Sequence, residues 1–369
     1  PTGVSSSSSA YVFADISGDG IVDALRFGPL QYYVGVAGGG FTPGSLVPPV
    51  GTTASTLLNI LFAAGDVDGD GDVDLVATWG GSAVWLNTGG NVFVDATAGS
   101  GVAVSTASST AAVNRLVDLD GDGALDLIFK SSSSTASVQK RVGPGVFAAP
   151  IPLPTPSPNF SLTHLPEAGD VDGDGLMDFV FTGTILSATA PNAPLVCLVR
   201  QTAPFVFSLT TTIPATGVAL LNYWAPAATL VDLNADGDAE IVVGSVHGVE
   251  IYDFVGGALT TPSARIPVVA AQFHLLDADG DGDVDVAATS AEPGSFGGGL
   301  GAVQILFNDG SGVPVVVPPT SSARPDKKTD ALPIDLDADG DLDLIAFGGP
   351  PNEGVVLIAT NDGTGVFHW

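Results

Sequence analysis

Short apolar runs recur along the whole chain, separated by clusters of glycine, serine, asparagine and aspartate. Runs of this length between turn-forming residues are typical of β-strands, whereas the apolar spacing of an amphipathic helix is almost absent. Four runs follow one another in each repeat, and the third and fourth are joined by hairpin turns such as Asn87-Thr88-Gly89-Gly90 and Asn361-Asp362-Gly363. The sequence therefore predicts an all-β protein built from units of four antiparallel strands, with very little helix.

The predicted strands follow the same order in each unit. Examples are residues 11–14, 61–64 and 273–276 for the first strand, 75–77, 127–129, 241–243 and 344–347 for the second, 83–86, 249–254, 302–307 and 355–359 for the third, and 92–94, 205–207 and 366–367 for the fourth. The last unit has its own fourth strand near the C-terminus. Long connections are expected at residues 149–166, 182–194, 208–227 and 289–301.

A nine-residue acidic loop links the first two strands of each unit and occurs seven times. Its pattern is Asp-x-[Asp/Asn/Ser]-x-Asp-Gly-x-x-[Asp/Glu], and the copies start near residues 15, 66, 118, 170, 232, 277 and 335. Seven repeats of four strands suit radial closure, which hides sheet edges. We predict a seven-bladed β-propeller with four antiparallel strands and one calcium loop per blade, in a single domain spanning residues 1–369.

The side chains of these loops fit a cage for a hard cation. Oxygen atoms at positions 1, 3, 5 and 9 converge because the glycine at position 6 permits a sharp turn, and the backbone carbonyl of position 7 and water complete the shell. Calcium fits this shell better than magnesium, and no loop contains the histidine or cysteine that zinc favours. The predicted ligands are Asp15, Ser17, Asp19, Ile21, Asp23, Asp66, Asp68, Asp70, Asp72, Asp74, Asp118, Asp120, Asp122, Ala124, Asp126, Asp170, Asp172, Asp174, Leu176, Asp178, Asp232, Asn234, Asp236, Asp238, Glu240, Asp277, Asp279, Asp281, Asp283, Asp285, Asp335, Asp337, Asp339, Asp341 and Asp343.

Two other interpretations of the loops are less consistent with the pattern. Aspartate and glycine also favour solvated turns, but seven copies that share one glycine and one carboxylate at position 9 indicate a common ligand. An EF-hand takes glutamate at position 12, where this chain has residues such as Arg26, Ala77 and Phe129. We therefore expect about seven structural calcium ions.

The balance of charge narrows the range of partners. The chain has 40 acidic and 10 basic residues, with a formal net charge of −30, so neither nucleic acid nor anionic lipid is expected to bind. No apolar run reaches the length of a membrane span, so direct membrane insertion is not expected. Cys197 is the single cysteine, so the chain cannot form an intrachain disulfide. We therefore expect bound metal to stabilise the fold instead. Because Pro1 is not an initiator methionine, we expect a processed or excised product.

The acidic loops, their flanking strands and the terminal turn Asn361-Asp362-Gly363-Thr364-Gly365-Val366-Phe367 resemble the FG-GAP/VCBS repeat family, which includes integrin α-subunit propellers. The resemblance covers essentially the whole chain. It implies calcium loops between the first and second strands of each blade, on one face of the disc. The first loop departs from the family pattern at Ser17, and the fifth loop departs from it at Asn234 and Glu240. We expect these two loops to bind calcium more weakly. Because members include adhesion receptors, lectins and parts of secreted enzymes, the fold alone does not fix the function.

Exposed aromatic side chains are candidates for stacking on sugars or anchoring a protein. Trp79 lies in a short turn, and Tyr223 and Trp224 lie in the connection at residues 208–227. The alternative is that Trp79, Trp85 and Trp224 pack between blades. The four histidines are scattered, and neither a Ser-His-Asp order nor a phosphate-binding loop occurs, so no catalytic residue is assigned.

These observations predict a secreted or cell-surface, non-enzymatic binding or adhesion module, lectin-like, that recognises a glycan or an extracellular protein and uses calcium as a structural staple. Two alternatives stay open. One is a self-associating subunit of a cell-surface layer or extracellular filament. The other is a non-catalytic or catalytic part of a carbohydrate-active enzyme.

Overall fold

The computed structural model describes residues 4–5, 11–26, 30–37, 40–52, 62–78, 81–106, 114–186, 193–214, 227–245, 248–259, 262–268, 272–290, 302–316, 330–336, 339–348 and 355–368. All of the regular secondary structure within these residues is β-strand, as the apolar runs predicted. Among them there is no helix long and apolar enough to cross a membrane. Backbone contacts divide the chain into two compact units. Unit 1 comprises Pro1–Pro154, Ala203–Val206 and Asp335–Asp339, and unit 2 comprises Thr155–Thr202, Phe207–Ile334 and Gly340–Trp369. The single domain at residues 1–369 stays a prediction.

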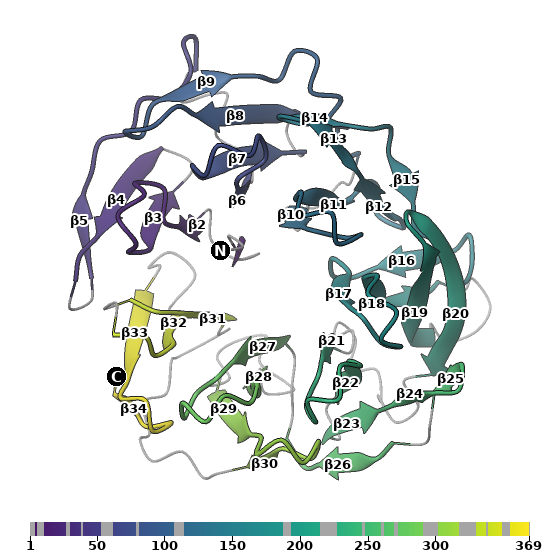
Figure 1. The fold of residues 1–369 in the computed structure, drawn as a ribbon. Helices are drawn as coiled ribbons and strands as arrows, with labels where there is room; N and C mark the ends of the chain where they lie inside the picture. The colour runs from purple at the N-terminus through teal and green to yellow at the C-terminus, as the bar shows by residue number, and fades with distance from the viewer. Residues whose placement is uncertain are drawn as a thin grey trace. The chain divides into compact units, whose positions relative to one another are not determined.

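Seven antiparallel sheets follow one another along the chain, and we number them as blades 1 to 7 (Figure 1). The strands of blades 1 to 3 are β1 (Val4–Ser5), β2 (Tyr11–Ala14), β3 (Asp23–Arg26), β4 (Gln31–Gly35), β5 (Phe41–Pro43), β6 (Phe62–Gly65), β7 (Asp74–Ala77), β8 (Ala83–Asn87), β9 (Phe93–Asp95), β10 (Asn114–Val117), β11 (Asp126–Lys130), β12 (Ala136–Gln139), β13 (Arg141–Gly143), β14 (Val146–Phe147) and β15 (Ile151–Pro152). Their sheet orders are β1-β2-β3-β4-β5, β6-β7-β8-β9 and β10-β11-β12-β15.

Blades 4 to 7 repeat this arrangement. Their strands are β16 (Phe160–Leu162), β17 (Glu167–Gly169), β18 (Asp178–Ile185), β19 (Ala193–Ala203), β20 (Val206–Pro214), β21 (Ala227–Val231), β22 (Glu240–Ser245), β23 (Gly248–Tyr252), β24 (Phe254–Val255), β25 (Ala258–Leu259), β26 (Ala264–Ile266), β27 (Gln272–Leu276), β28 (Asp285–Ser290), β29 (Ala302–Phe307), β30 (Val315–Val316), β31 (Asp330–Ile334), β32 (Asp343–Gly348), β33 (Val355–Asn361) and β34 (Phe367–His368). The fold class is the predicted seven-bladed β-propeller, and blade 7 has its own fourth strand, β34, as expected.

The sequence placed some strand boundaries wrongly. In blade 5 the predicted run 249–254 ends at Tyr252, and Phe254–Val255 pairs with Ala258–Leu259 as a separate ribbon before the fourth strand, β26. Within the connections at 149–166 and 208–227, β15, β16 and part of β20 are strands rather than loops. Isolated short runs with proline or threonine carry too weak an alternation to be recognised as strands before their partners are known.

Apolar side chains of consecutive blades form shared cores. In unit 1, Phe62 and Trp85 of blade 2 pack with their ring centroids 4.9 Å apart, in one cluster with Leu25 and Tyr32 of blade 1. In unit 2, Val180 and Leu198 of blade 4 share a cluster with Ile241 of blade 5. The second strands β7 and β11 are buried along their whole length because side chains on both of their faces are covered. Burial between sheets therefore joins each blade to the next within its unit.

A polar side chain at the end of the third strand, or just beyond it, adds a second link between blades. Asn87 Nδ2 donates to the Ile16 carbonyl of the preceding blade at 3.1 Å, and Asn361 Nδ2 donates to the Ala278 carbonyl at 2.7 Å. Asn308 and Arg141 make the same kind of bond, to the carbonyls of Leu233 and Val67. We call this place the staple position, and the pairing of Ile241 with Tyr252 puts Phe254 there in blade 5.

Candidate functional site

In five of the loops, the acidic residue at position 9 accepts hydrogen bonds both from its own loop and from the staple position at or near the end of the third strand. In blade 2, Asp74 is fully buried, and its two carboxylate oxygens accept the backbone N–H groups of Val67 at 2.9 Å and of Asn87 at 2.8 Å. The second residue of the loop and the staple position make the same pair of bonds to Asp23, Asp126, Asp178 and Asp285. Position 9 thus fixes the loop against the third strand.

Positions 1, 5 and 6 shape the turn. Asp66 accepts the N–H groups of Gly69 at 2.6 Å and Gly71 at 3.0 Å, and Asp70 accepts the N–H of Asp72 at 2.9 Å. Gly71 has a φ of +94°, and the other sixth-position glycines also have a positive φ, between +82° and +100°. A side chain there would be strained, so this glycine is required by the backbone of the loop.

Four loops bring three carboxylates close enough to hold a metal ion. The groups, whose oxygen atoms lie within 4.8 Å of one another, are Asp66-Asp68-Asp70, Asp118-Asp120-Asp122, Asp170-Asp172-Asp178 and Asp277-Asp279-Asp285. One oxygen of Asp279, its Oδ1, is buried and has no hydrogen-bond partner among the described residues, and the same holds for Oδ1 of Asp120 and Asp172. A buried carboxylate oxygen without a partner is costly unless a cation satisfies it, and among the described residues no basic side chain pairs with Asp279, so the donor set of blade 6 fits a hard metal ion.

Burial also disfavours the charged form of the ninth-position acids Asp74, Asp126, Asp178 and Asp285. Desolvation raises the pKa of Asp74 and of Asp178 to about 7, against the lowering effect of their backbone hydrogen bonds. Desolvation likewise raises the pKa of Asp126 and Asp285 to about 6. A divalent cation beside these groups would favour the charged form instead.

The loops that depart from the common pattern differ in their contacts. In blade 5, Asn234 Nδ2 donates to Glu240 Oε1 at 2.8 Å, and Glu240 Oε2 accepts the N–H of Leu233 at 2.7 Å. In blade 1, the Ser17 hydroxyl lies 3.5 Å from Asp15 Oδ1. Neither loop appears among the four carboxylate groups. Asp337 of blade 7 lies outside the described residues.

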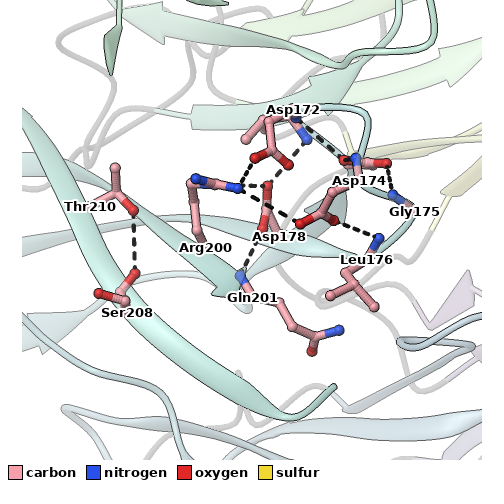
Figure 2. Close-up of polar contacts among 11 residues, drawn as sticks. Asp172, Asp174, Gly175, Leu176, Asp178, Arg200, Gln201, Ser208 and Thr210 are labelled. Carbon is pink, nitrogen blue, oxygen red and sulfur yellow. Dashed lines mark hydrogen bonds and ion pairs between the residues drawn. The ribbon is translucent and has the colours of Figure 1, made fainter. Parts of the chain in front are cut away.

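Basic side chains reach into two of the loops. In blade 3, Lys140 Nζ donates to Asp120 and, at 2.9 Å, to Asp122, and these bonds raise the pKa of the ammonium group. In blade 4, Arg200 pairs with Asp172 and lies 3.8 Å from Asp174 (Figure 2). Its Nε also lies 3.9 Å from the buried Asp178. The sequence interpretation assigned these carboxylates to metal alone and missed both basic residues.

A pocket opens beside Arg200, between blades 4 and 5. Its volume is ≈ 340 Å³, and it is lined by Asp172, Arg200, Asp238, Phe254, Val255, Gly256 and Gly257. The Arg200 guanidinium carbon lies 5.3 Å from the centroid of the Phe254 ring, which occupies the staple position. Asparagine at this position would bond to the neighbouring blade, as it does in blades 2, 6 and 7, whereas phenylalanine has no donor to offer.

Of the aromatic residues singled out in the sequence, Trp85 is the one that lies among the described residues. Trp79, Tyr223 and Trp224 lie outside the described residues. Trp85 is buried between blades 1 and 2, which confirms the alternative interpretation for that tryptophan. Sequence reasoning missed Arg200, which lies in the third strand β19, and Phe254, which follows the third strand β23. The pairing of the second and third strands locates both residues, and the loop pattern does not, because their distance from the loop along the chain differs between blades.

Comparison with known proteins supports the fold. A lectin of Agrocybe aegerita, described as recognising non-reducing terminal N-acetylglucosamine, is 18% identical with a TM-score of 0.65, and the match covers 95% of this chain and 90% of the lectin. The V. cholerae biofilm matrix protein Bap1 is 11% identical over 97% of this chain and 75% of its own, with a TM-score of only 0.32. The comparison with curated protein sequences gave no match.

The model of the FG-GAP-like repeat matches residues 66–129, 118–181 and 277–346. Each match begins at the first aspartate of an acidic loop and continues into the following blade. Together the matches cover just over half of the chain. The chain therefore belongs to the FG-GAP-like repeat family.

Proposed function

We propose that the chain is a calcium-stabilised, non-enzymatic module that binds a glycan in the pocket between blades 4 and 5. The observation that carries this proposal is the lining of the pocket, which combines the carboxylates of Asp172 and Asp238 with the Arg200 guanidinium. Sugar hydroxyls both donate and accept hydrogen bonds, so a site that offers acceptors beside a fixed donor suits them. The volume falls within the range of pockets for small ligands.

The pocket holds its polar groups in place before a ligand arrives. Arg200 is anchored by Asp172 on one side and by the Phe254 ring on another. Asp238, at position 7 of the blade 5 loop, packs against Gly173 of the blade 4 loop, where a Cβ atom would collide with its carboxylate. Because these side chains are already ordered, a ligand would not have to offset the entropy of fixing them.

Calcium has a structural role in this proposal. The ligands are the side chains at positions 1, 3, 5 and 9 with the carbonyl at position 7, and the donor set of blade 6, with the unpartnered Asp279 Oδ1, fits best. An ion that binds only the folded loop stabilises the fold through linkage.

The similarity to the Agrocybe aegerita lectin is consistent with a glycan ligand, and terminal N-acetylglucosamine is the first sugar to test. We propose that the module works as a secreted or cell-surface protein, where calcium concentrations match the affinities of extracellular calcium modules. Trp79, Tyr223 and Trp224 stay predicted ligand contacts.

The test is a glycan array, run in calcium and again in chelator, with wild-type protein and two variants. Asp238→Ala removes a carboxylate from the pocket. The control Asp283→Ala removes the equivalent carboxylate at position 7 of the blade 6 loop, and Asp283 does not line the pocket. Both variants keep the position 7 carbonyl. We expect selective binding that Asp238→Ala weakens at least about tenfold, the effect of losing one charge-assisted hydrogen bond, and that Asp283→Ala leaves unchanged. A blank array with folded protein, or equal effects of the two variants, would refute the pocket and favour a protein partner.

A further inference from the structure

One position, in the third strand or just after its end, is equivalent in all seven blades, and in blades 3 and 4 its side chain reaches the acidic loop. The second and third strands pair Leu75 with Trp85 and Leu127 with Gln139, so the next residue, Leu86 in blade 2 and Lys140 in blade 3, is equivalent. The register in blade 4, with Phe179 opposite Val199, places Arg200 there. By the same register the residues in blades 1 to 7 are Val34, Leu86, Lys140, Arg200, Asp253, Phe307 and Thr360.

Blades 3 and 4 are therefore the blades with a basic residue at this position, in a chain with only ten basic residues. Both side chains contact the carboxylates at loop positions 3 and 5, which are Asp120 and Asp122 for Lys140. For Arg200 they are Asp172 and Asp174, and its Nε also approaches Asp178 at position 9 (Figure 2). The side chains are only 32% and 20% exposed, so each cation lies within its carboxylate cluster rather than in solvent.

A basic side chain in the cluster changes the energetics of metal binding. The ammonium or guanidinium group already neutralises part of the negative charge, and a calcium ion at the same carboxylates would be repelled by it at short range. To bind, the ion must first displace the base, and for Arg200 that also means leaving the Phe254 ring. In blade 2 the equivalent residue is the apolar Leu86, which brings no charge to the carboxylates of Asp66, Asp68 and Asp70, and the nearby Arg141 is bonded to the Val67 carbonyl.

We propose that Lys140 and Arg200 take the place of calcium in blades 3 and 4, so that these two loops are held together without metal. This inference rests on the calcium binding proposed for the other blades. It explains why the pocket beside Arg200 has its donor and acceptors fixed by the chain itself. It also predicts that the seven loops fall into two classes, in which residues far from each loop in sequence set the metal affinity.

The test counts bound calcium by native mass spectrometry and measures affinity by competition with a chromophoric chelator. The variants are Lys140→Leu with Arg200→Leu, which give blades 3 and 4 the residue that blade 2 has. The control is Arg265→Leu, which removes one positive charge from an exposed pair with Glu250, where Arg265 is 73% exposed. We expect the double variant to bind two more calcium ions than wild type, or to bind two ions at least tenfold tighter, and the control to match wild type.

Equal counts and affinities in wild type and double variant, with calcium bound in both, would overturn the inference and leave calcium binding intact. If neither wild type nor the double variant bound calcium, both this inference and the calcium binding proposed for the other blades would be overturned. A reciprocal variant, Leu86→Lys, guards against misfolding of the double variant. The blade 2 loop of this variant should no longer bind calcium, so an unchanged calcium count in a folded Leu86→Lys protein would also overturn the inference.

Discussion

Replacing Asn308 by alanine tests whether the staple position joins blades 5 and 6. Asn308 is 2% exposed, and its Nδ2 donates to the carbonyls of Leu233 at 2.7 Å and Val284 at 3.3 Å. Alanine keeps the backbone N–H bond to Asp285 but leaves the Leu233 carbonyl of the preceding blade without this donor. A buried acceptor that loses its partner costs about 1–3 kcal/mol, so we expect the free energy of unfolding to fall by about 2 kcal/mol.

Urea denaturation followed by intrinsic fluorescence measures this loss in the presence of calcium. The matched control is Asn159→Ala, because Asn159 is exposed and its described hydrogen bonds involve only its backbone. We expect the control to stay within about 0.5 kcal/mol of wild type. Asn361→Ala, which breaks the equivalent bond to Ala278, should match Asn308→Ala, and the two losses should add. A loss below 0.5 kcal/mol for Asn308→Ala would show that the blades are held by apolar packing without the staple.

Three further predictions concern metal, thiol and backbone. Chelation should lower the melting temperature reversibly, since each site at calcium one hundred times its Kd contributes about 2.7 kcal/mol, and an unchanged melt by differential scanning fluorimetry would refute structural calcium. Cys197 is fully buried and burial raises the pKa of its thiol to about 12, so a thiol reagent should label it only as blade 4 opens. Labelling of native protein as fast as that of unfolded protein would contradict this. Gly173→Ala should cost about 1–2 kcal/mol more than Gly18→Ala, because both glycines have a positive φ but only Gly173 has the Asp238 carboxylate against its Cβ position, and equal losses in urea titrations would contradict that contact.

The sequence determined the features that depend on neighbouring residues. The apolar runs predicted the strands, and the loop pattern identified positions 1, 3, 5 and 9, because a nine-residue turn brings its own side chains together whatever surrounds it. Asp66, Asp68 and Asp70 are close in the structure for this reason. Short strands such as β24 were missed because their pairing is decided by a partner outside the run.

Only the tertiary structure decided which side chains from other segments reach the loops. Asn361 bonds to a carbonyl 83 residues away, and Arg200 meets Asp172 only because β18 and β19 pair in a particular register. The packing of blade 5 against blade 4 puts Phe254 beside Arg200 and forms the pocket. Local spacing cannot specify such contacts, because strand register and the packing of one blade on the next set them, and both depend on burial across the whole sheet.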